Sequence, residues 1–344
     1  MSILTNTFDF IKRHKKAIIA SSTIVAGGAA SIYYYLSKKE ESLKVVDEKW
    51  ENEYINKINI LKKKHEYLLN AYSAARQLKM KEYVQKILKI IDDNYNIENI
   101  KTQIMDAETS DIRAKAFINL GKTAIARDIS FSIITCCMLV ALECQANVLA
   151  YEISHQSRFK NTSSSTDSEA YYTQTFLEMI TLFISENNLK NIMTKINEIV
   201  FTDMESVDLK KSYTKDEFIN NFVNLGKAVL HDDFFQSISD KFVPNMKFVR
   251  QQQIELVILF EDYVDLLDII NQNHILETLI EQYLTNFSSI AFSKIKNDNC
   301  YYVGLIPKIS ESYDQAVRQN SNLNVSDIIT DIQNICYDKL LNKA

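Results

Sequence analysis

The sequence predicts an all-α protein: an elongated helical bundle with long amphipathic helices around a central apolar helix, preceded by one N-terminal transmembrane helix. Three observations predict it. The 344 residues include only 5 Gly and 2 Pro, a composition that favours long helices joined by polar loops. Apolar residues recur at helical spacing along most of the chain, and no stretch alternates convincingly with period two. One stretch of twenty residues near the N-terminus contains no charge.

That uncharged stretch runs from Ala17 to Leu36 and ends in an aromatic run, Tyr33 to Tyr35. Twenty helical residues span about 30 Å, the thickness of a bilayer's hydrocarbon core. We therefore expect a short basic targeting segment (1–16), a transmembrane anchor (17–36) and a cytosolic all-helical domain (37–344). The targeting segment carries the basic residues Lys12, Arg13, Lys15 and Lys16.

Two other interpretations of this stretch remain open. A cleaved signal peptide also has a basic start, an apolar run and small residues such as Gly27 to Ala30. A buried helix of a soluble protein is the third possibility. Charge does not decide the orientation of an anchor, because four Lys or Arg residues lie within about fifteen residues on each side.

The charge distribution and the cysteines limit the class of protein. The net charge is −5, and because residues 1–36 carry +3, the remainder carries −8. A body this acidic is a poor electrostatic match for nucleic acid. The five Cys residues form no C-x-x-C pair, which favours a reducing compartment and hence a cytosolic body.

In the first half of the body, residues 42–91 read as one long amphipathic helix, or as two with a break near residues 62–66. After a break at residues 94–96, Ile97, Ile100 and Ile104 mark a short helix. Residues 106–111 are expected to form a loop that caps the next helix, which carries Phe117, Leu120 and Ala124.

Residues 131–142, FSIITCCMLVAL, are apolar all round but too short to span a bilayer. They predict the central buried helix, continuing through Ile153. Further helices are expected after a loop at 155–168, with capping boxes at Thr166/Glu169 and Thr214/Glu217, then at 254–270 and 275–292, and after Ser326, with a loop at 297–307.

A short similarity recurs inside the body. Residues 117–128 read FINLGKTAIARD, and residues 222–233 read FVNLGKAVLHDD. A single pair separated by 105 residues does not make a solenoid. It is either an old duplication of a helical unit or a chance similarity.

The sequence offers little sign of catalysis. The five His residues are scattered, without a metal-ligand partner at i+4, and residues 231–233 (His-Asp-Asp) fit a helix end better than a cation site. The chain has no nucleophile elbow and no phosphate-binding loop. We expect no enzyme, no cofactor, no metal and no small-molecule substrate, and composition and periodicity alone indicate a membrane-anchored helical interaction protein.

Five parts of the chain carry a family resemblance: FDFIKRHKKAIIASSTIVAGGAASIYY from Phe8, His65, the Cys137–Val140 run with Gln145–Asn147, residues 224–239 (NLGKAVLHDDFFQSIS) and residues 303–310 (VGLIPKIS). Together they resemble the peroxisomal biogenesis factor 3 family. The similarity keeps the same order over nearly the whole chain. It implies an all-helical cytosolic domain on the peroxisomal membrane, with the basic cluster and anchor acting as targeting signal.

The resemblance also implies a function. Members of the family are not enzymes. They dock peroxisomal biogenesis factor 19, the cytosolic receptor-chaperone for peroxisomal membrane proteins, so that its cargo enters the bilayer. The receptor contributes an amphipathic helix that lies in an apolar groove, a mode of recognition that needs apolar walls.

Position by position, the resemblance locates this groove in the first half of the body. Phe117 stands where the family has Trp, Leu120 matches a Leu and Arg127 an Arg. Ile104 matches an apolar wall position and Arg113 a basic one. Phe keeps an aromatic anchor but lacks the indole N–H. The alternative function is a helical tether or scaffold on another organelle membrane.

Overall fold

The computed structural model describes residues 50–155, 175–205, 208–236, 254–295, 299–320 and 325–343. The expected targeting residues Lys12, Arg13, Lys15 and Lys16 and the expected anchor lie outside the described residues. The expected capping box at Thr166/Glu169 lies outside them too.

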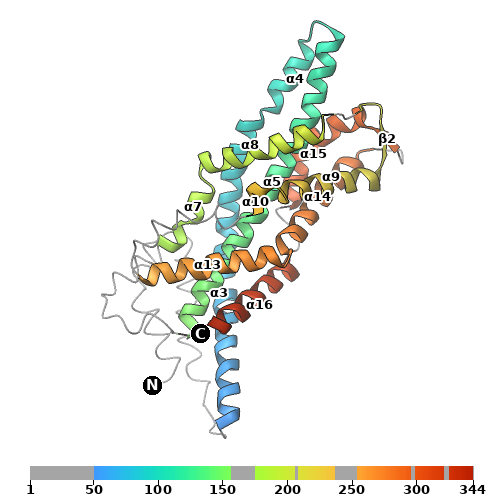
Figure 1. The fold of residues 1–344 in the computed structure, drawn as a ribbon. Helices are drawn as coiled ribbons and strands as arrows, with labels where there is room; N and C mark the ends of the chain where they lie inside the picture. Colours follow the sequence, from blue (N-terminus) through green and yellow to red (C-terminus); the bar gives the residue numbers. More distant parts are fainter. Residues whose placement is uncertain are drawn as a thin grey trace.

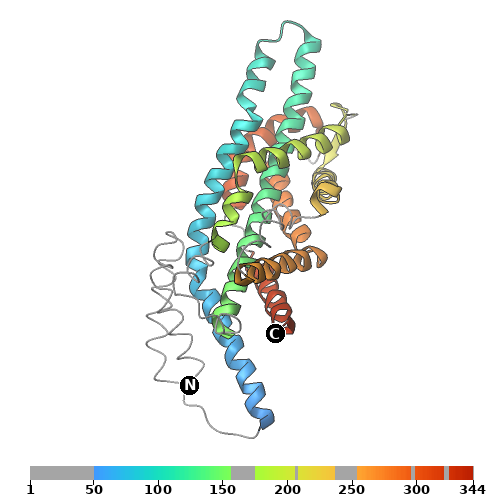
Figure 2. The same cartoon turned by 60° about the vertical axis from the view of Figure 1, so that its left-hand side comes forward.

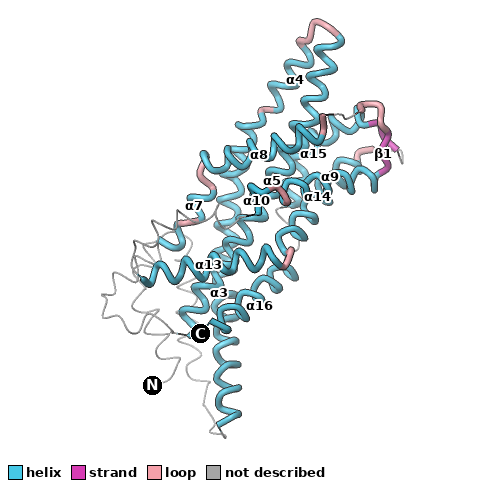
Figure 3. The backbone as a smooth tube through the Cα atoms, in the orientation of Figure 1, coloured by secondary structure: helices cyan, strands magenta, loops and turns pink. Residues whose placement is uncertain are grey.

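The described residues are mostly helical and form an elongated body, as the sequence predicts (Figure 1; Figure 3). The elements in chain order are α3 (Trp50–Tyr95), α4 (Ile97–Met105), α5 (Ser110–His155), α7 (Ile180–Phe183), α8 (Glu186–Asp203), β1 (Ser212–Thr214), α9 (Lys215–Leu230), α10 (Asp233–Gln236), α13 (Ile254–Gln272), α14 (Ile275–Ser293), β2 (Asn299–Tyr301), α15 (Tyr302–Asn320) and α16 (Ser326–Lys343).

Helix α5 is the centre of the fold. It packs against α3, α4, α8, α13, α14, α15 and α16. Its apolar run at residues 131–142 is almost wholly buried, which confirms the expected central helix. By length and composition α5 could cross a membrane, but 94% of its most apolar window is buried inside the body. We therefore treat it as a core helix.

The helix expected around Phe117 and the buried helix expected at residues 131–142 form one helix in the structure. The helix with Phe117 continues without interruption into the apolar run and beyond, giving α5 a length of 46 residues. No Pro lies in this stretch and its only Gly, Gly121, is in a helix interior, where it is tolerated at a modest cost.

Helix α3 is also unbroken over 46 residues, so the alternative of a break near residues 62–66 is wrong. Polar residues interrupt the apolar pattern there because two of them face the core. Lys64 Nζ donates to the Ser154 carbonyl at 3.1 Å, and His65 Nε2 lies 3.1 Å from Asn147 Oδ1. Figure 2 shows α3 and α5 running side by side in opposite directions.

A buried ion pair further joins these two helices. Arg76 Nε lies 3.1 Å from Glu143 Oε1, and Gln333 Nε2 of α16 donates to the other carboxylate oxygen at 3.3 Å. Burial raises the pKa of Glu143, while Arg76 and Gln333 act in the opposite direction. These partners satisfy a carboxylate that would be costly to bury alone.

The prediction of a loop at residues 297–307 is wrong. Residues 299–301 form β2, and α15 begins at Tyr302 with Pro307 inside it. Gly and Pro favoured a loop, but Leu305, Ile306 and Ile309 are almost fully buried. The free energy of burying these side chains outweighs the hydrogen bond that Pro307 cannot donate.

The described residues contain one short sheet. Strands β1 and β2 pair antiparallel, with Tyr213 opposite Cys300. Tyr302 N donates to the Lys211 carbonyl at 2.9 Å and so extends the pairing into the start of α15. The Thr214/Glu217 capping box that starts α9 is present as expected, with Glu217 N donating to Thr214 Oγ1 and Thr214 N to Glu217 Oε2.

Candidate docking surface

The hairpin of α4 and α5 forms one end of the molecule, opposite the end where α3 begins (Figure 2). An Asn makes the bend between α3 and α4. Asn96 has φ 35°, a left-handed conformation that Asn adopts more readily than most residues. Its side-chain oxygen accepts from Asn99 N at 3.2 Å and caps α4. The bend lets α4 pack against the first turns of α5.

Two hydrogen bonds hold the loop at the tip of the hairpin. Ile112 N donates to Thr109 Oγ1 at 3.2 Å, and Arg113 Nη2 donates to the Ala107 carbonyl at 3.2 Å. Arg113 therefore fastens the loop, while its side chain remains at an exposed position. The expected loop is present but shorter than the predicted 106–111, because it spans residues 106–109 and the helix begins at Ser110.

Large apolar side chains face solvent at this end. Met105 is 72% exposed and Ile112 53% exposed, while Ile104 and Phe117 of the same two helices are partly buried and pack against the main core. We call these four residues the apical surface. Exposed apolar groups that gather on one part of a protein are typical of interaction sites. The sequence pattern does not single out Met105 and Ile112, because they lie at the two edges of the loop and outside the apolar helix faces.

Leu120, by contrast, does not reach the surface. It is 4% exposed and belongs to the main core. Arg127 is also buried: its Nη2 donates to the Ser310 carbonyl at 3.3 Å, and its guanidinium carbon lies 3.7 Å from the centre of the Tyr313 ring. Of the residues that the resemblance relates to the groove, Ile104, Arg113 and Phe117 therefore share the hairpin, and the other two support it from inside the body.

The base of the hairpin fits closely against α15. A Cβ on Gly121 would lie 2.9 Å from the side chain of Ile306 and 3.1 Å from the Tyr302 hydroxyl. Glycine is what permits this approach of the two helices. Lys122, the next residue, donates from Nζ to the Phe201 carbonyl at 3.3 Å near the end of α8.

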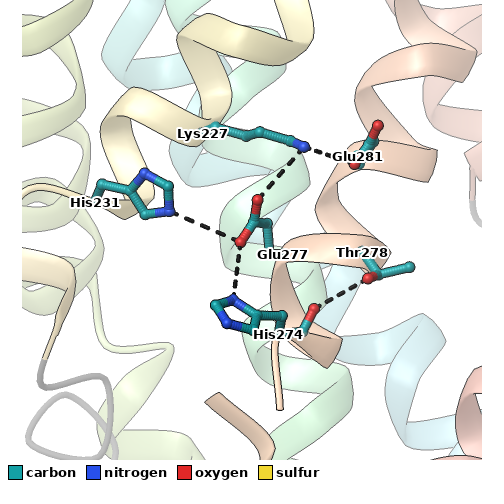
Figure 4. A network of polar contacts seen from close by, with 6 residues as sticks. All are labelled: Lys227, His231, His274, Glu277, Thr278 and Glu281. Atoms are coloured by element: carbon teal, nitrogen blue, oxygen red, sulfur yellow. Dashed lines mark hydrogen bonds and ion pairs between the residues drawn. The ribbon is translucent and has the colours of Figure 1, made fainter. Parts of the chain in front are cut away.

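A polar network joins α9 to α14 on another side of the body (Figure 4). Glu277 accepts contacts from Lys227 Nζ at 3.4 Å, His231 Nε2 at 3.7 Å and His274 Nδ1 at 3.2 Å. Lys227 also lies 2.9 Å from Glu281. Partial burial raises the pKa of Glu277, but the hydrogen bonds from His274 and Lys227 outweigh it, so the net pKa is lowered.

Potential metal ligands and cysteine thiols are the remaining groups to consider in the described ranges. No group of three His, Cys, Asp or Glu side chains there could hold a metal ion. His231 is the C-cap residue of α9, and its Nε2 lies 3.7 Å from Glu277. Cys136, Cys137, Cys144 and Cys336 are buried, and burial raises the pKa of the first three thiols, which disfavours the reactive thiolate.

The sequence matches no protein-family model, and no curated protein matches it significantly.

Proposed function

We propose that this protein is a membrane-anchored docking factor of the peroxisome. In this proposal its apical surface binds an amphipathic helix of peroxisomal biogenesis factor 19, the receptor-chaperone that carries new peroxisomal membrane proteins. The observation that carries the proposal is the exposure of Met105 and Ile112 at the end of the body farthest from the start of α3.

The position of this surface suits a docking role. The predicted anchor ends at Leu36 and α3 begins at Trp50, so the apical surface would point away from the membrane and toward the cytosol. A cytosolic carrier could then reach it without contact with the bilayer. The order of the segments that resemble the peroxisomal biogenesis factor 3 family supports the same proposal.

The chemistry of the surface also suits an amphipathic helix. Such a helix presents apolar residues at i, i+3, i+4 and i+7, and the apical surface offers two exposed and two half-buried apolar side chains on adjacent helices. The exposed Arg113 beside them could meet an acidic group on the polar face of the partner.

The test is a binding titration. Full-length protein in lipid nanodiscs is mixed with a fluorescent peptide that contains the amphipathic helix from the receptor's N-terminal region, and anisotropy is recorded. Ile112→Ser and Met105→Ser should each weaken binding by about ten- to a hundredfold, since burying one such side chain contributes about 1.5–3 kcal/mol. The matched controls are Leu78→Ser on α3 and Leu182→Ser on α7, whose side chains are 68% and 51% exposed.

Each outcome decides between the alternatives. Weakening by the apical variants alone supports the docking surface. Equal binding by all variants would move the site elsewhere on the body. Absence of binding by the wild-type protein would reject the docking function and favour a tether or scaffold on another membrane, which imaging of the tagged protein in cells would then locate.

A further inference from the structure

A pocket of about 340 Å³ opens beside α9, between the end of α8 and the short sheet. It shares no residue with the apical surface. Its volume falls within the range of small-molecule sites in proteins, at the lower end. A ligand of this pocket must therefore be small.

Apolar and aromatic residues are the majority of the residues that line the pocket, although polar atoms contribute about half of its surface. Phe218, Phe222 and Leu225 of α9 line one side, and Met204 and Ile125 line others. All five are less than 8% exposed in the folded chain. The aromatic rings meet edge to face, with Tyr213 6.4 Å from Phe218 and 6.1 Å from Tyr302 between ring centres. A planar aromatic ligand would extend this arrangement.

The polar residues that line the pocket are all exposed and carry both signs of charge. Asp203 is the last residue of α8, and Lys211 lies just before β1 with its Nζ 4.8 Å from the centre of the Tyr213 ring. Asn221 and Asn224 add two amide groups from α9. With a single lysine in the lining, the pocket suits a carboxylate far better than a polyphosphate.

Tyr302 also belongs to the lining of the pocket, and the residue is 4% exposed. Its hydroxyl lies against Gly121 of α5, which is outside the lining, so the ligand contacts of the pocket come from its other residues.

We propose that this pocket binds a small molecule with one aromatic ring system, an ammonium group and a carboxylate, of the class of the free aromatic amino acids. The ring packs among the aromatic side chains of the wall. The carboxylate pairs with Lys211 and the ammonium with Asp203, while the two asparagines complete the hydrogen bonding. This site is independent of the proposed docking function.

Four fluorinated probes that share one ring test the proposal. They are 5-fluorotryptophan, 5-fluorotryptamine, 5-fluoroindole-3-acetate and 5-fluoroindole, which carry both charges, only the ammonium, only the carboxylate and neither. Fluorine NMR line widths are recorded with the full-length protein in nanodiscs, and with empty nanodiscs as the blank. We expect 5-fluorotryptophan to bind most tightly, by about five- to tenfold over the neutral probe.

Variants locate the site and separate the two charges. Ala228→Trp, at an exposed position that lines the pocket, should abolish binding, whereas Asn220→Trp, exposed on the same helix but outside the lining, should not. Lys211→Ala should weaken the two carboxylate probes and spare 5-fluorotryptamine. Asp203→Ala should do the reverse.

Saturable binding that follows this pattern supports the site and its ligand class. Saturable binding that Ala228→Trp leaves intact would place the ligand elsewhere and overturn the proposal. Binding of all four probes with equal affinity would overturn the zwitterionic ligand class, and absence of saturable binding would overturn the site. None of these results depends on whether the receptor peptide binds the apical surface.

Discussion

Asp128 offers a sharp test of the packing around α5. It lies in the middle of the central helix, is 2% exposed, and its Oδ1 is buried without a hydrogen-bond partner. Burial raises the pKa of this carboxyl from 3.8 to about 8, and the nearby Arg127 guanidinium offsets only part of the effect. The substitution Asp128→Asn keeps the size of the side chain and removes its titration.

The sign and size of the effect follow from proton linkage. The Asp128 carboxyl binds its proton more tightly in the folded protein than in the unfolded chain. Proton binding therefore stabilises the folded state, and this stabilisation is fully present below pH 3.8. It is lost as the pH rises through about 8. Between pH 6 and pH 8 this loss amounts to about 2 kcal/mol for pKa values of 3.8 and 8. The Asp128→Asn variant escapes this loss.

Urea unfolding of the full-length protein in detergent micelles, followed by circular dichroism from pH 6 to pH 9, measures the difference. We expect the advantage of Asp128→Asn over the wild type to grow by about 2 kcal/mol between pH 6 and pH 8. Asp111→Asn, at an exposed position in the first turn of α5, is the control for losing a surface carboxylate. If the Asp128→Asn and wild-type curves stay parallel over this range, the carboxyl does not titrate there and the reasoning fails.

Two further predictions concern the contact between α9 and α14. Glu277→Gln should lower stability by about 0.5–1 kcal/mol at pH 7 by removing the pairing with Lys227 and His274. Because the pKa of Glu277 is lowered from 4.5 in the folded protein, this difference should shrink as the pH falls below about 4.5 and vanish once the pH is below the lowered pKa, which urea unfolding at acidic pH can check. Gly226→Ala should destabilise by about 1–2 kcal/mol despite the better helix propensity of Ala, because the new Cβ would lie 2.1 Å from Cδ1 of the buried Leu284. A double variant with Leu284→Ala should cost less than the two single changes together, and simple additivity in thermal unfolding would contradict the proposed clash.

Most helices were predictable because each presents one continuous apolar face or a clear cap. The Thr214/Glu217 capping box marked the start of α9, and the uninterrupted apolar run at 131–142 marked the buried centre of α5. Such signals are local, because a few consecutive residues are enough to specify each of them. Tertiary packing then confirmed rather than changed them.

The errors arose where distant contacts overrode local preference. Pro307 suggested a loop, but the burial of Leu305 and Ile306 in the core holds α15 together around it. Lys64 and His65 suggested a helix break until their hydrogen bonds to α5 accounted for them. The exposure of Ile112 at the apical surface also depends on where α4 ends, which local periodicity does not specify.

The internal similarity takes on physical meaning when its two copies are compared. In each copy the glycine lies where a neighbouring helix approaches too closely for a Cβ, with Gly121 against α15 and Gly226 against α14. The lysine that follows each glycine bonds to another element, Lys122 to the end of α8 and Lys227 to α14.

The two copies differ in what lies beyond the helix. The Phe at the start of the first copy, Phe117, packs against the main core but stays partly exposed, whereas its counterpart Phe222 is buried and lines the pocket beside α9. The same local pattern therefore contributes to both candidate binding sites of the body. The surroundings of the aromatic side chain, rather than the pattern itself, decide whether it stays partly exposed or is buried.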